Sequence, residues 1–336
     1  MELRVLQPVE RRRRRRRRRW PRVLLVAALL AAGAAVGLWR LHGHSAARPV
    51  PAAAARAPSR KPGARGPLPK RAPVRPLRLL SGSPAPTHHR FDPPLRARSA
   101  ILVDASTGHV LWKLRAHRRR PIASTTKIMT ALLALKRLPL HDAITVDPAA
   151  TRVPLVKEGL RPRERVRVWK LLYSLLLYSG NDDASALAIA AGGSRRGFLR
   201  LMNAEARRLG LRDTHFNSPS GALDERNFSS AWDLAALTRY AMRDARFRRI
   251  VRTRFKRVRW SAPTFAKEYV NKNLLLGRYP GANGVKTGYT SKAGHCLVAA
   301  AKRGPVELIA VVLRSGDTYG DARRLLNLGF AELGAG

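Results

Sequence analysis

The chain of 336 residues contains little cysteine, few aromatic residues and few acidic residues. Its single cysteine, Cys296, excludes an intrachain disulfide, so burial of apolar side chains must stabilise the fold. Cys296 begins an apolar run, and we expect it to be a buried strand residue rather than a nucleophile. Aromatic residues make up 6% of the chain, and the six tryptophans are scattered without a stacking pattern for nucleic-acid bases.

Acidic residues number 21 against 66 basic residues, which gives a net charge of +45. Residues 1–90 hold 22 basic and 2 acidic residues, and residues 91–336 hold 44 and 19, so the imbalance extends along the whole chain. Such a charge favours polyanions, which include nucleic acid, anionic lipid and acidic wall polymer. The segment Arg243–Arg259, with nine basic residues among 17, is a candidate patch for acidic wall or lipid. The alternatives are a solvated face and a compositional bias of the genome.

The N-terminus predicts export. Residues 1–22 include nine consecutive arginines, Arg11–Arg19, and residues 23–39 are 17 uncharged and mostly apolar positions. A basic segment followed by an apolar one is typical of a signal peptide or a signal anchor. The positive-inside rule keeps the arginines in the cytoplasm and places the rest of the chain outside it. A membrane-spanning helix needs about 20 residues, so both cleavage and anchoring stay open. The alternative, a nucleic-acid-binding arm, is disfavoured because the apolar segment follows so directly.

Residues 40–95 are predicted to be a disordered linker rich in Pro, Arg and Ala. Twelve prolines lie between Pro49 and Pro94 with few large apolar side chains, so no core can form there. Repeated proline favours an extended, semi-rigid spacer. The folded domain is therefore expected at residues 96–336.

This domain is expected to begin and end with strands. Two early strands, at 99–103 and 109–114, should form a hairpin. Apolar spacing then predicts five helices, and two further strands and a last helix follow them. The helices are expected at 126–138, 168–177, 184–191, 198–209 and 232–242, the late strands at 296–302 and 306–314, and the last helix at 322–330. This order predicts an α/β (α+β) sandwich: a mostly antiparallel sheet from both chain ends, packed by helices, with an inserted helical subdomain.

Three short motifs occur once each, in the order Ser124-Thr125-Thr126-Lys127, Ser179-Gly180-Asn181 and Lys286-Thr287-Gly288. A serine becomes a strong nucleophile only when a base removes its proton. The three-residue step at a helix start brings Ser124 and Lys127 onto one face. A lysine acts as a base only when it is neutral, and burial and a second positive charge both lower its pKa. Lys286 is expected to supply that second charge.

The other motif residues offer groups that bind a peptide. Ser179 offers a hydroxyl that relays a proton to a leaving amine, and Asn181 offers an amide that holds a substrate carbonyl. Thr287 offers a hydroxyl to a substrate carboxylate, and Gly288 leaves room for a substrate along the strand edge. Each motif alone is equally consistent with a helix cap or a turn. Their ordered combination is a known signature of class A β-lactamases and penicillin-binding proteins, so it predicts an active-site cleft held by the helical subdomain.

Longer stretches around the motifs resemble the low-molecular-mass penicillin-binding proteins, the serine-type D-Ala-D-Ala carboxypeptidases with a β-lactamase/transpeptidase-like fold. The similar stretches are 122–130, 177–184, 216–221, 228–234, 271–273 and 284–290. The resemblance covers residues 97–333, the whole expected domain. Many family members continue into a β-rich second domain and a C-terminal anchor helix, whereas this sequence stops at Gly336. We therefore expect any membrane anchor to be the N-terminal segment.

The resemblance implies a reaction on peptidoglycan. Ser124 would attack the carbonyl between the two terminal D-Ala residues of a stem peptide, and Lys127 would take its proton. The backbone N–H groups of Ser124 and Tyr289 would form the oxyanion hole. Ser179 would help to protonate the departing D-Ala, and water would free the acyl-enzyme. β-Lactam antibiotics would acylate Ser124 as well.

The remaining roles implied by the resemblance concern binding. Asn181 would hold the substrate amide, and Lys286 and Thr287 would bind the terminal carboxylate beside Gly288. No metal or organic cofactor is needed, and the expected location is extracytoplasmic, on the periplasmic or cell-wall side.

Alternatives remain at this stage. A D,D-endopeptidase would use the same site. Class A β-lactamases carry Ser-Asp-Asn and a Glu-x-x-Leu-Asn pattern, which is absent between Asn181 and Lys286. A non-catalytic cell-wall-binding protein should lack a catalytic residue, and none is missing. A nucleic-acid binder is disfavoured by the export signal.

Overall fold

The computed structural model describes residues 79–80, 93–222, 226–260 and 266–335. The chain divides into a unit of residues 1–70 and a unit of residues 71–336. The predicted segments 1–22 and 23–39 and most of the predicted linker lie outside the described residues. In the part of the chain that is described, every helix is too short or too polar to cross a membrane.

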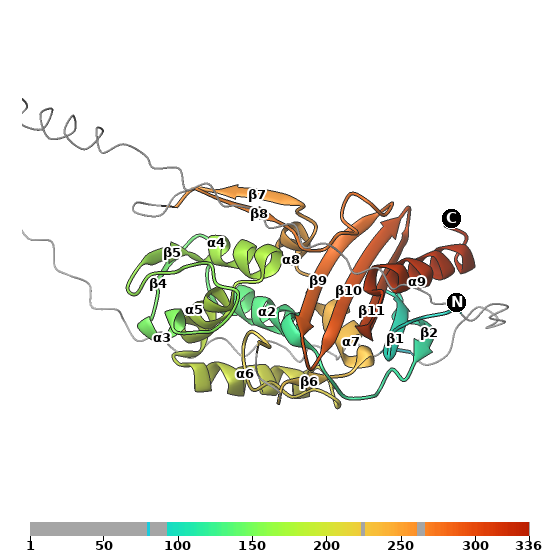
Figure 1. Cartoon of the computed structure of the whole chain (residues 1–336), viewed down its shortest axis with the longest axis horizontal. Coiled ribbons are helices and arrows are strands. Elements are labelled where there is room, and N and C mark those ends of the chain that lie inside the picture. Colours follow the sequence, from blue (N-terminus) through green and yellow to red (C-terminus); the bar gives the residue numbers. More distant parts are fainter. Residues whose placement is uncertain (1–78, 81–92, 223–225, 261–265, 336) are drawn as a thin grey trace, which may run out of the picture. The chain divides into compact units, whose positions relative to one another are not determined.

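A five-stranded antiparallel sheet of order β2-β1-β11-β10-β9 joins the two ends of the second unit (Figure 1). The strands are β1 Ser99–Asp104, β2 Val110–Leu114, β9 Ala282–Thr290, β10 Gly294–Arg303 and β11 Val306–Ser315. β1 pairs with β11, so that Ser99 lies opposite Leu313 and Asp104 lies opposite Leu308. The prediction of a mostly antiparallel sheet built from both ends of the chain is confirmed.

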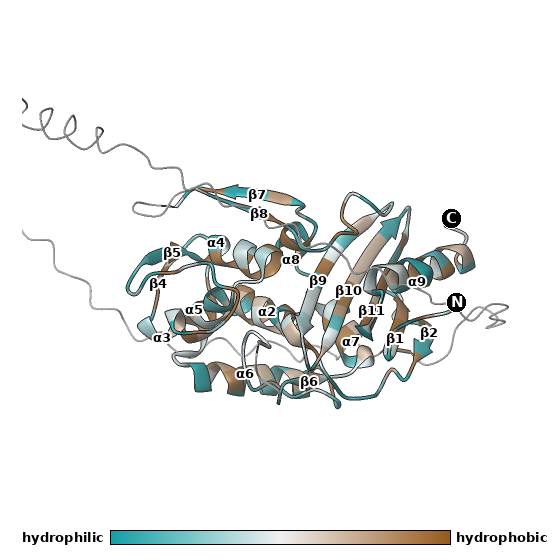
Figure 2. Ribbon diagram, viewed as in Figure 1, coloured by the Kyte–Doolittle hydropathy of each residue, from teal (hydrophilic) through white to brown (hydrophobic). Residues whose placement is uncertain are grey.

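The sheet separates two apolar layers because successive side chains of a strand point to opposite faces. On β1, Leu102 belongs to the layer that contains α9 (Thr318–Glu332), whereas Ile101 and Val103 belong to the larger layer toward the other helices. Figure 2 shows the apolar colouring along β1, β10 and β11. The fold is thus the predicted sandwich of one sheet between helical layers.

The helical part lies between β2 and β9 in the sequence and beside the sheet in space (Figure 1). Its helices are α2 Lys127–Arg137, α3 Pro148–Thr151, α4 Val168–Tyr173, α5 Asn181–Gly192, α6 Arg195–Arg208, α7 Ala231–Ala241 and α8 Ala245–Val251, with a 3₁₀ turn η1 Ala123–Thr126 and a π-helical turn η2 Ser174–Tyr178. Three strand pairs join them: β3 Arg120–Pro121 with β6 Phe228–Ser229, β4 Ala143–Thr145 with β5 Arg165–Arg167, and β7 Phe255–Val258 with β8 Lys267–Val270. Nine of the 11 residues of α2 are buried, so α2 is the central helix.

Two expectations need correction. The helix expected at 168–177 changes at Ser174 into the π-helical turn η2, which ends before Ser179. The apolar pattern does not predict β9, because glycine and polar residues interrupt it, and the motif at 286–288 lies within this strand. Ahead of residue 96, the expected start of the domain, Leu79 is buried and the backbone of Leu80 bonds to Gly108 and Val110.

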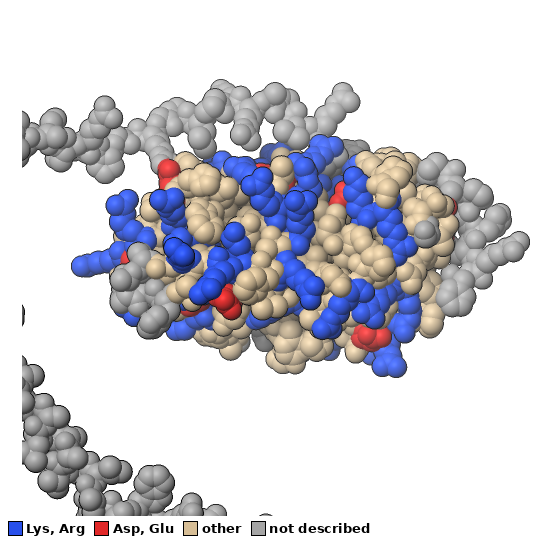
Figure 3. All heavy atoms as spheres, turned by 90° about the horizontal axis from the view of Figure 1, so that it is seen from above, with Lys and Arg blue, Asp and Glu red and all other residues tan. Residues whose placement is uncertain are grey.

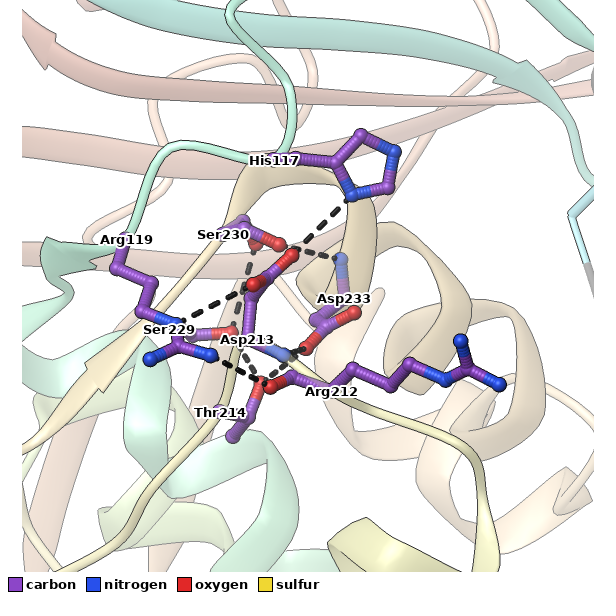
Figure 4. A network of polar contacts seen from close by, with 8 residues as sticks. All are labelled: His117, Arg119, Arg212, Asp213, Thr214, Ser229, Ser230 and Asp233. Atoms are coloured by element: carbon purple, nitrogen blue, oxygen red, sulfur yellow. Dashed lines mark hydrogen bonds and ion pairs between the residues drawn. The ribbon is translucent and has the colours of Figure 1, made fainter.

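A polar network holds the segment that leads from β2 to η1 (Figure 4). His117 Nδ1 lies 3.2 Å from Asp213 Oδ2, and Arg119 Nε donates to Asp213 Oδ1 at 3.3 Å. Asp233, in the first turn of α7, accepts from the Asp213 backbone N–H and from the Thr214 hydroxyl, both at 2.7 Å. Burial raises the pKa of Asp233, while these hydrogen bonds lower it. The network ties the approach to Ser124 to the N-terminus of α7.

Candidate active site

Ser124 and Lys127 face each other at the junction of η1 and α2, as the sequence predicts. Lys127 Nζ lies 2.9 Å from Ser124 Oγ, 2.8 Å from Asn181 Oδ1 and 3.1 Å from the Ser220 carbonyl oxygen. A neutral amine has two N–H groups and one lone pair. A neutral amine can donate to Asn181 and Ser220 and accept from the Ser124 hydroxyl, whereas an ammonium group would donate to all three oxygens. The contacts are compatible with a neutral lysine that accepts the serine proton, and the surroundings of the side chain decide between the two forms.

The surroundings of Lys127 favour this neutral form. The side chain is fully buried, and burial lowers the pKa of Lys127 well below its usual range, with a further lowering by the charge of Lys286. The carboxyl groups of Asp183 and Asp182 act in the opposite direction. Burial also lowers the pKa of Lys286 to about 7, assisted by the charge of Lys272. Lys286 thus lies close enough to Lys127 for its charge to lower the pKa of Lys127, and its catalytic role stays a prediction.

Ser179 is presented by a strained turn. It lies at the end of η2 with φ 80° and ψ 33°, in the left-handed region, and its N–H donates to the Ser174 carbonyl at 2.8 Å. A Cβ on the next residue, Gly180, would lie 1.9 Å from Asp183 Oδ2, so a larger residue there would require the Asp183 side chain to move. This turn aims Ser179 at the same cleft as Ser124.

Asn181 begins α5 and is nearly buried. Its Oδ1 faces Lys127 Nζ, and its Nδ2 donates to the Pro154 carbonyl at 3.0 Å. In this structure Asn181 thus holds Lys127 and the loop before Glu158, and the sequence-based role of holding a substrate amide stays a prediction.

The third motif lies on β9, at the edge of the sheet. Thr287, Gly288 and Tyr289 line the cleft, whereas Lys286 is buried behind them and its Nζ donates to the Thr287 carbonyl at 3.1 Å. A Cβ on Gly288 would lie 3.0 Å from Ser124 N, so β9 packs directly against the turn that carries the nucleophile. Only a glycine permits this close approach.

A cleft of about 350 Å³ brings these residues together. Members of all three motifs line it, together with side chains from both ends of the domain. The lining residues are Ser124, Val156, Ser179, Lys272, Thr287, Gly288, Tyr289, His295, Cys296, Leu297, Thr318 and Tyr319. Among the described residues, no group of three or more His, Cys, Asp or Glu side chains is placed to hold a metal ion.

Lys272 lines the cleft although none of the three motifs contains it. Its Nζ lies 4.7 Å from the centre of the Tyr178 ring, and burial lowers its pKa. The asparagines on either side fix its loop, because Asn271 Nδ2 donates to the Thr253 carbonyl at 3.0 Å and Asn273 Nδ2 to the Gly284 carbonyl at 2.7 Å. Two anchoring asparagines around one lysine are the sequence signal that could have identified it.

Comparisons with known proteins agree with this geometry. Residues 87–316 match a family model described as D-alanyl-D-alanine carboxypeptidase. The chain is 36% identical over 262 residues to a D-alanyl-D-alanine carboxypeptidase of Streptomyces sp. strain K15, covering 71% of this chain and 89% of that protein. It is 35% identical over 223 residues to DacF of Bacillus subtilis, covering 64% of this chain and 57% of DacF.

Two further similar proteins are named for other activities. The crystal structure of the Streptomyces K15 DD-transpeptidase superposes with a TM-score of 0.67 at 34% identity, covering 72% of this chain and 99% of that one. A D-alanyl-D-alanine endopeptidase of Escherichia coli is 33% identical over 239 residues, covering 69% of this chain and 77% of that protein.

Proposed function

Because the chain belongs to the D-alanyl-D-alanine carboxypeptidase family, we propose that it is a serine peptidase that removes the terminal D-Ala from peptidoglycan stem peptides. The observation that carries this proposal is the position of Lys127 Nζ, 2.9 Å from Ser124 Oγ in a fully buried place that lowers its pKa well below the usual range. A neutral amine at this distance can take the hydroxyl proton as the serine attacks.

Acylation begins when Ser124 Oγ attacks the carbonyl carbon of the penultimate D-Ala and its proton passes to Lys127. The backbone N–H groups of Ser124 and Tyr289 stabilise the oxygen that becomes negative. When the peptide bond breaks, Ser179 delivers a proton to the departing D-Ala amine, and the proton held by Lys127 replaces it. Water then attacks the ester on Ser124, which releases the shortened peptide and restores the hydroxyl.

The terminal carboxylate of the substrate needs positive charge in the cleft. Lys272 and Thr287 line the cleft and offer an ammonium group and a hydroxyl. Lys286 lies behind Thr287 and adds its positive field without reaching the cleft surface. We assign the direct contact to Lys272 and Thr287 and the supporting charge to Lys286.

Endopeptidase cleavage of wall crosslinks is the second candidate function. Similar proteins are called carboxypeptidase, endopeptidase and DD-transpeptidase, so one site serves several reactions among them. The endopeptidase reading differs only in the amine that leaves, which for a crosslink is a side-chain amine. A soluble pentapeptide and a purified crosslinked dimer, assayed side by side, distinguish the two.

The proposed location is extracytoplasmic, with the N-terminal segment 23–39 as signal peptide or anchor. The basic surface is proposed to bind anionic lipid or wall polymer. Lys and Arg side chains cover much of the face in Figure 3, and Asp and Glu side chains are few. Eight of the nine basic side chains of Arg243–Arg259 are exposed. Sedimentation with anionic and neutral vesicles, and with insoluble wall, at low and high salt tests this binding, which should weaken with salt.

The test of the peptidase function is acylation of the full chain by penicillin, followed by intact mass. A lasting adduct in the wild type that is absent from Ser124→Ala supports the function, and release of D-Ala from a pentapeptide identifies the reaction. Ser106→Ala, in the β1–β2 turn outside the cleft, is the control and should acylate normally. A transient adduct with rapid penicillin hydrolysis would instead indicate a β-lactamase. A folded wild type without any adduct would reject catalysis in favour of a wall-binding protein.

A further inference from the structure

A buried hydroxyl lies between two carboxyl groups behind the wall of the cleft. Ser174 Oγ lies 2.8 Å from Glu158 Oε2 and also within hydrogen-bond distance of Asp183 Oδ2. Ser174 and Asp183 are fully buried, and Glu158 is 8% exposed. A hydroxyl carries one hydrogen and can donate to only one of the two groups. The second contact therefore needs a proton on one of the carboxyl groups, which then donates to Ser174.

The contacts of the two carboxyl groups decide which one carries the proton. Glu158 Oε1 lies 2.5 Å from Lys267 Nζ, so this carboxyl group has a cation as its ion-pair partner. Asp183 has no ion pair among the described residues, and its Oδ1 has no hydrogen-bond partner there. Burial, followed by the charges of Asp182 and Glu158, raises the pKa of Asp183 well above its usual range. An unpaired carboxylate in such a place would be costly.

We propose that Asp183 is a positioning residue whose carboxyl group stays protonated at neutral pH and donates to Ser174, which in turn donates to Glu158. This role rests on the proposed acylation of Ser124. The hydrogen-bonded chain links α5, the π-helical turn η2 and the loop that contains Glu158. Lys267 ends the chain from β8.

The chain of hydrogen bonds holds the turn that presents Ser179. The backbone carbonyl of Ser174 accepts from the Ser179 N–H at 2.8 Å, so the position of Ser174 sets the position of Ser179. The loop before Glu158 is tied to the same place, because the Asn181 N–H donates to the Val156 carbonyl at 2.8 Å and Val156 lines the cleft. A protonated Asp183 thus fixes two walls of the cleft through one side chain.

A protonated Asp183 also keeps a negative charge away from Lys127. A carboxylate at this position would raise the pKa of Lys127 and so lower the fraction of Lys127 that is neutral and able to accept the serine proton. The other titratable groups around Asp183 are already paired or neutral. Asp182 accepts four backbone N–H groups, Glu158 is paired with Lys267, and burial raises the pKa of the Tyr269 phenol.

The test compares Asp183→Ala with Asp183→Asn in the full chain. Asparagine is neutral and of the same shape, and its N–H can replace the carboxyl O–H as the donor to Ser174. We expect Asp183→Ala to lower the rate of penicillin acylation about tenfold or more, because Ser179 is misplaced. Asp183→Asn should recover most of that rate. The acid limb of its pH–rate profile, where Lys127 loses its proton, should match that of the wild type.

Infrared difference spectroscopy gives a second result that does not depend on activity. The wild type minus Asp183→Asn spectrum at pH 7 should contain the C=O stretch of a protonated carboxylic acid. Absence of this band, or an acid limb of Asp183→Asn that moves by half a pH unit or more (about a threefold change in the equilibrium) to lower pH, would show that Asp183 is ionised and overturn the proposal. A wild type without acylation would reject the peptidase function, while the infrared band would still test Asp183.

Discussion

Replacing Gly288 with alanine should slow acylation far more than it destabilises the fold. The new Cβ would lie 3.0 Å from Ser124 N and 3.1 Å from both Ile122 O and Thr125 N. These atoms belong to the backbone before α2 and cannot rotate away as a side chain could. β9 must therefore move away from the turn by a few tenths of an ångström. This movement widens the gap between β9 and the backbone of η1, the two segments that flank the cleft.

The magnitude follows from the proposed oxyanion hole, whose donors are the N–H groups of Ser124 and Tyr289. Loss of one such donor costs about 2.7–4 kcal/mol in the transition state. A shift of β9 weakens this contact rather than removing it, so we expect penicillin acylation to slow by about tenfold to a hundredfold. Overpacking of this kind costs about 1–3 kcal/mol of stability, which should lower the melting temperature without unfolding the protein.

The assay is the second-order acylation rate from intact mass at several penicillin concentrations, with thermal unfolding of the same samples. Gly316→Ala is the matched control, because its Cβ would meet only the side chain of Arg96 at 3.9 Å. It should acylate at the wild-type rate. A folded Gly288→Ala protein that acylates within about threefold of the wild type would refute the argument that this backbone spacing sets the rate.

Three further predictions concern charged side chains. Lys272→Met should raise KM for a D-Ala-D-Ala peptide by about tenfold, the value of a lost charge-assisted contact, with a smaller change in kcat; an unchanged KM would remove Lys272 from the binding site. Lys286 has a pKa of about 7 in the folded state, below its unfolded value, so the unfolded state binds more protons between pH 7 and 10.5 and stability rises with pH across that window. Lys286→Met should flatten this rise, increase stability at pH 7, and move the acid limb of acylation to higher pH because Lys127 loses a neighbouring positive charge; a limb that stays in place would contradict the coupling. Asp182→Asn should lose at least one of three backbone hydrogen bonds to residues 158–160 and lower the free energy of unfolding by about 1–3 kcal/mol, measured by urea denaturation; an unchanged midpoint would show that the loop is held by other contacts.

The sequence predicted those parts of the fold whose pattern is local. The hairpin of β1 and β2, helix α2, and strands β10 and β11 have clear apolar periodicity, and all are found close to the predicted bounds. The family resemblance is also confirmed by the match over residues 87–316. Strand β9 could not be predicted from periodicity, because glycine and polar residues interrupt its apolar pattern. Its pairing with β10 is a contact between strands that the sequence of β9 alone does not reveal.

The sequence predicted which residues form the candidate site, but not how deeply each side chain lies in the wall of the cleft. Ser124 with Lys127, and Ser179 with Thr287 and Gly288, are brought to one cleft as the motifs indicate. The depth of Lys286 depends on which way a strand residue points, and this depends on the register of β9 with β10. Sequence spacing carries no information on that register.

Two neighbours of the motifs were not identified from the sequence as parts of the site. Lys272 lies in a stretch that resembles the family, and its loop is anchored by two asparagines whose carbonyl partners lie 18 and 11 positions away. Glu158 has no motif around it, and its contact with Ser174, 16 positions further on, depends on the π-helical turn. These contacts depend on backbone turns that apolar periodicity does not predict.

The pairing of β1 with β11 has a consequence for the order of folding. Ser99 pairs with Leu313, 214 positions further along the chain, so the sheet closes a loop almost as long as the domain. Loop-closure entropy must be overcome before such a pairing gains any stability, which makes folding slow. The residues from Val306 onward are needed both for this closure and for the cleft, which Thr318 and Tyr319 line. A nascent chain that still ends before Tyr319 therefore contains Ser124 but lacks part of the cleft. Activity should appear only after nearly the whole domain has been synthesised.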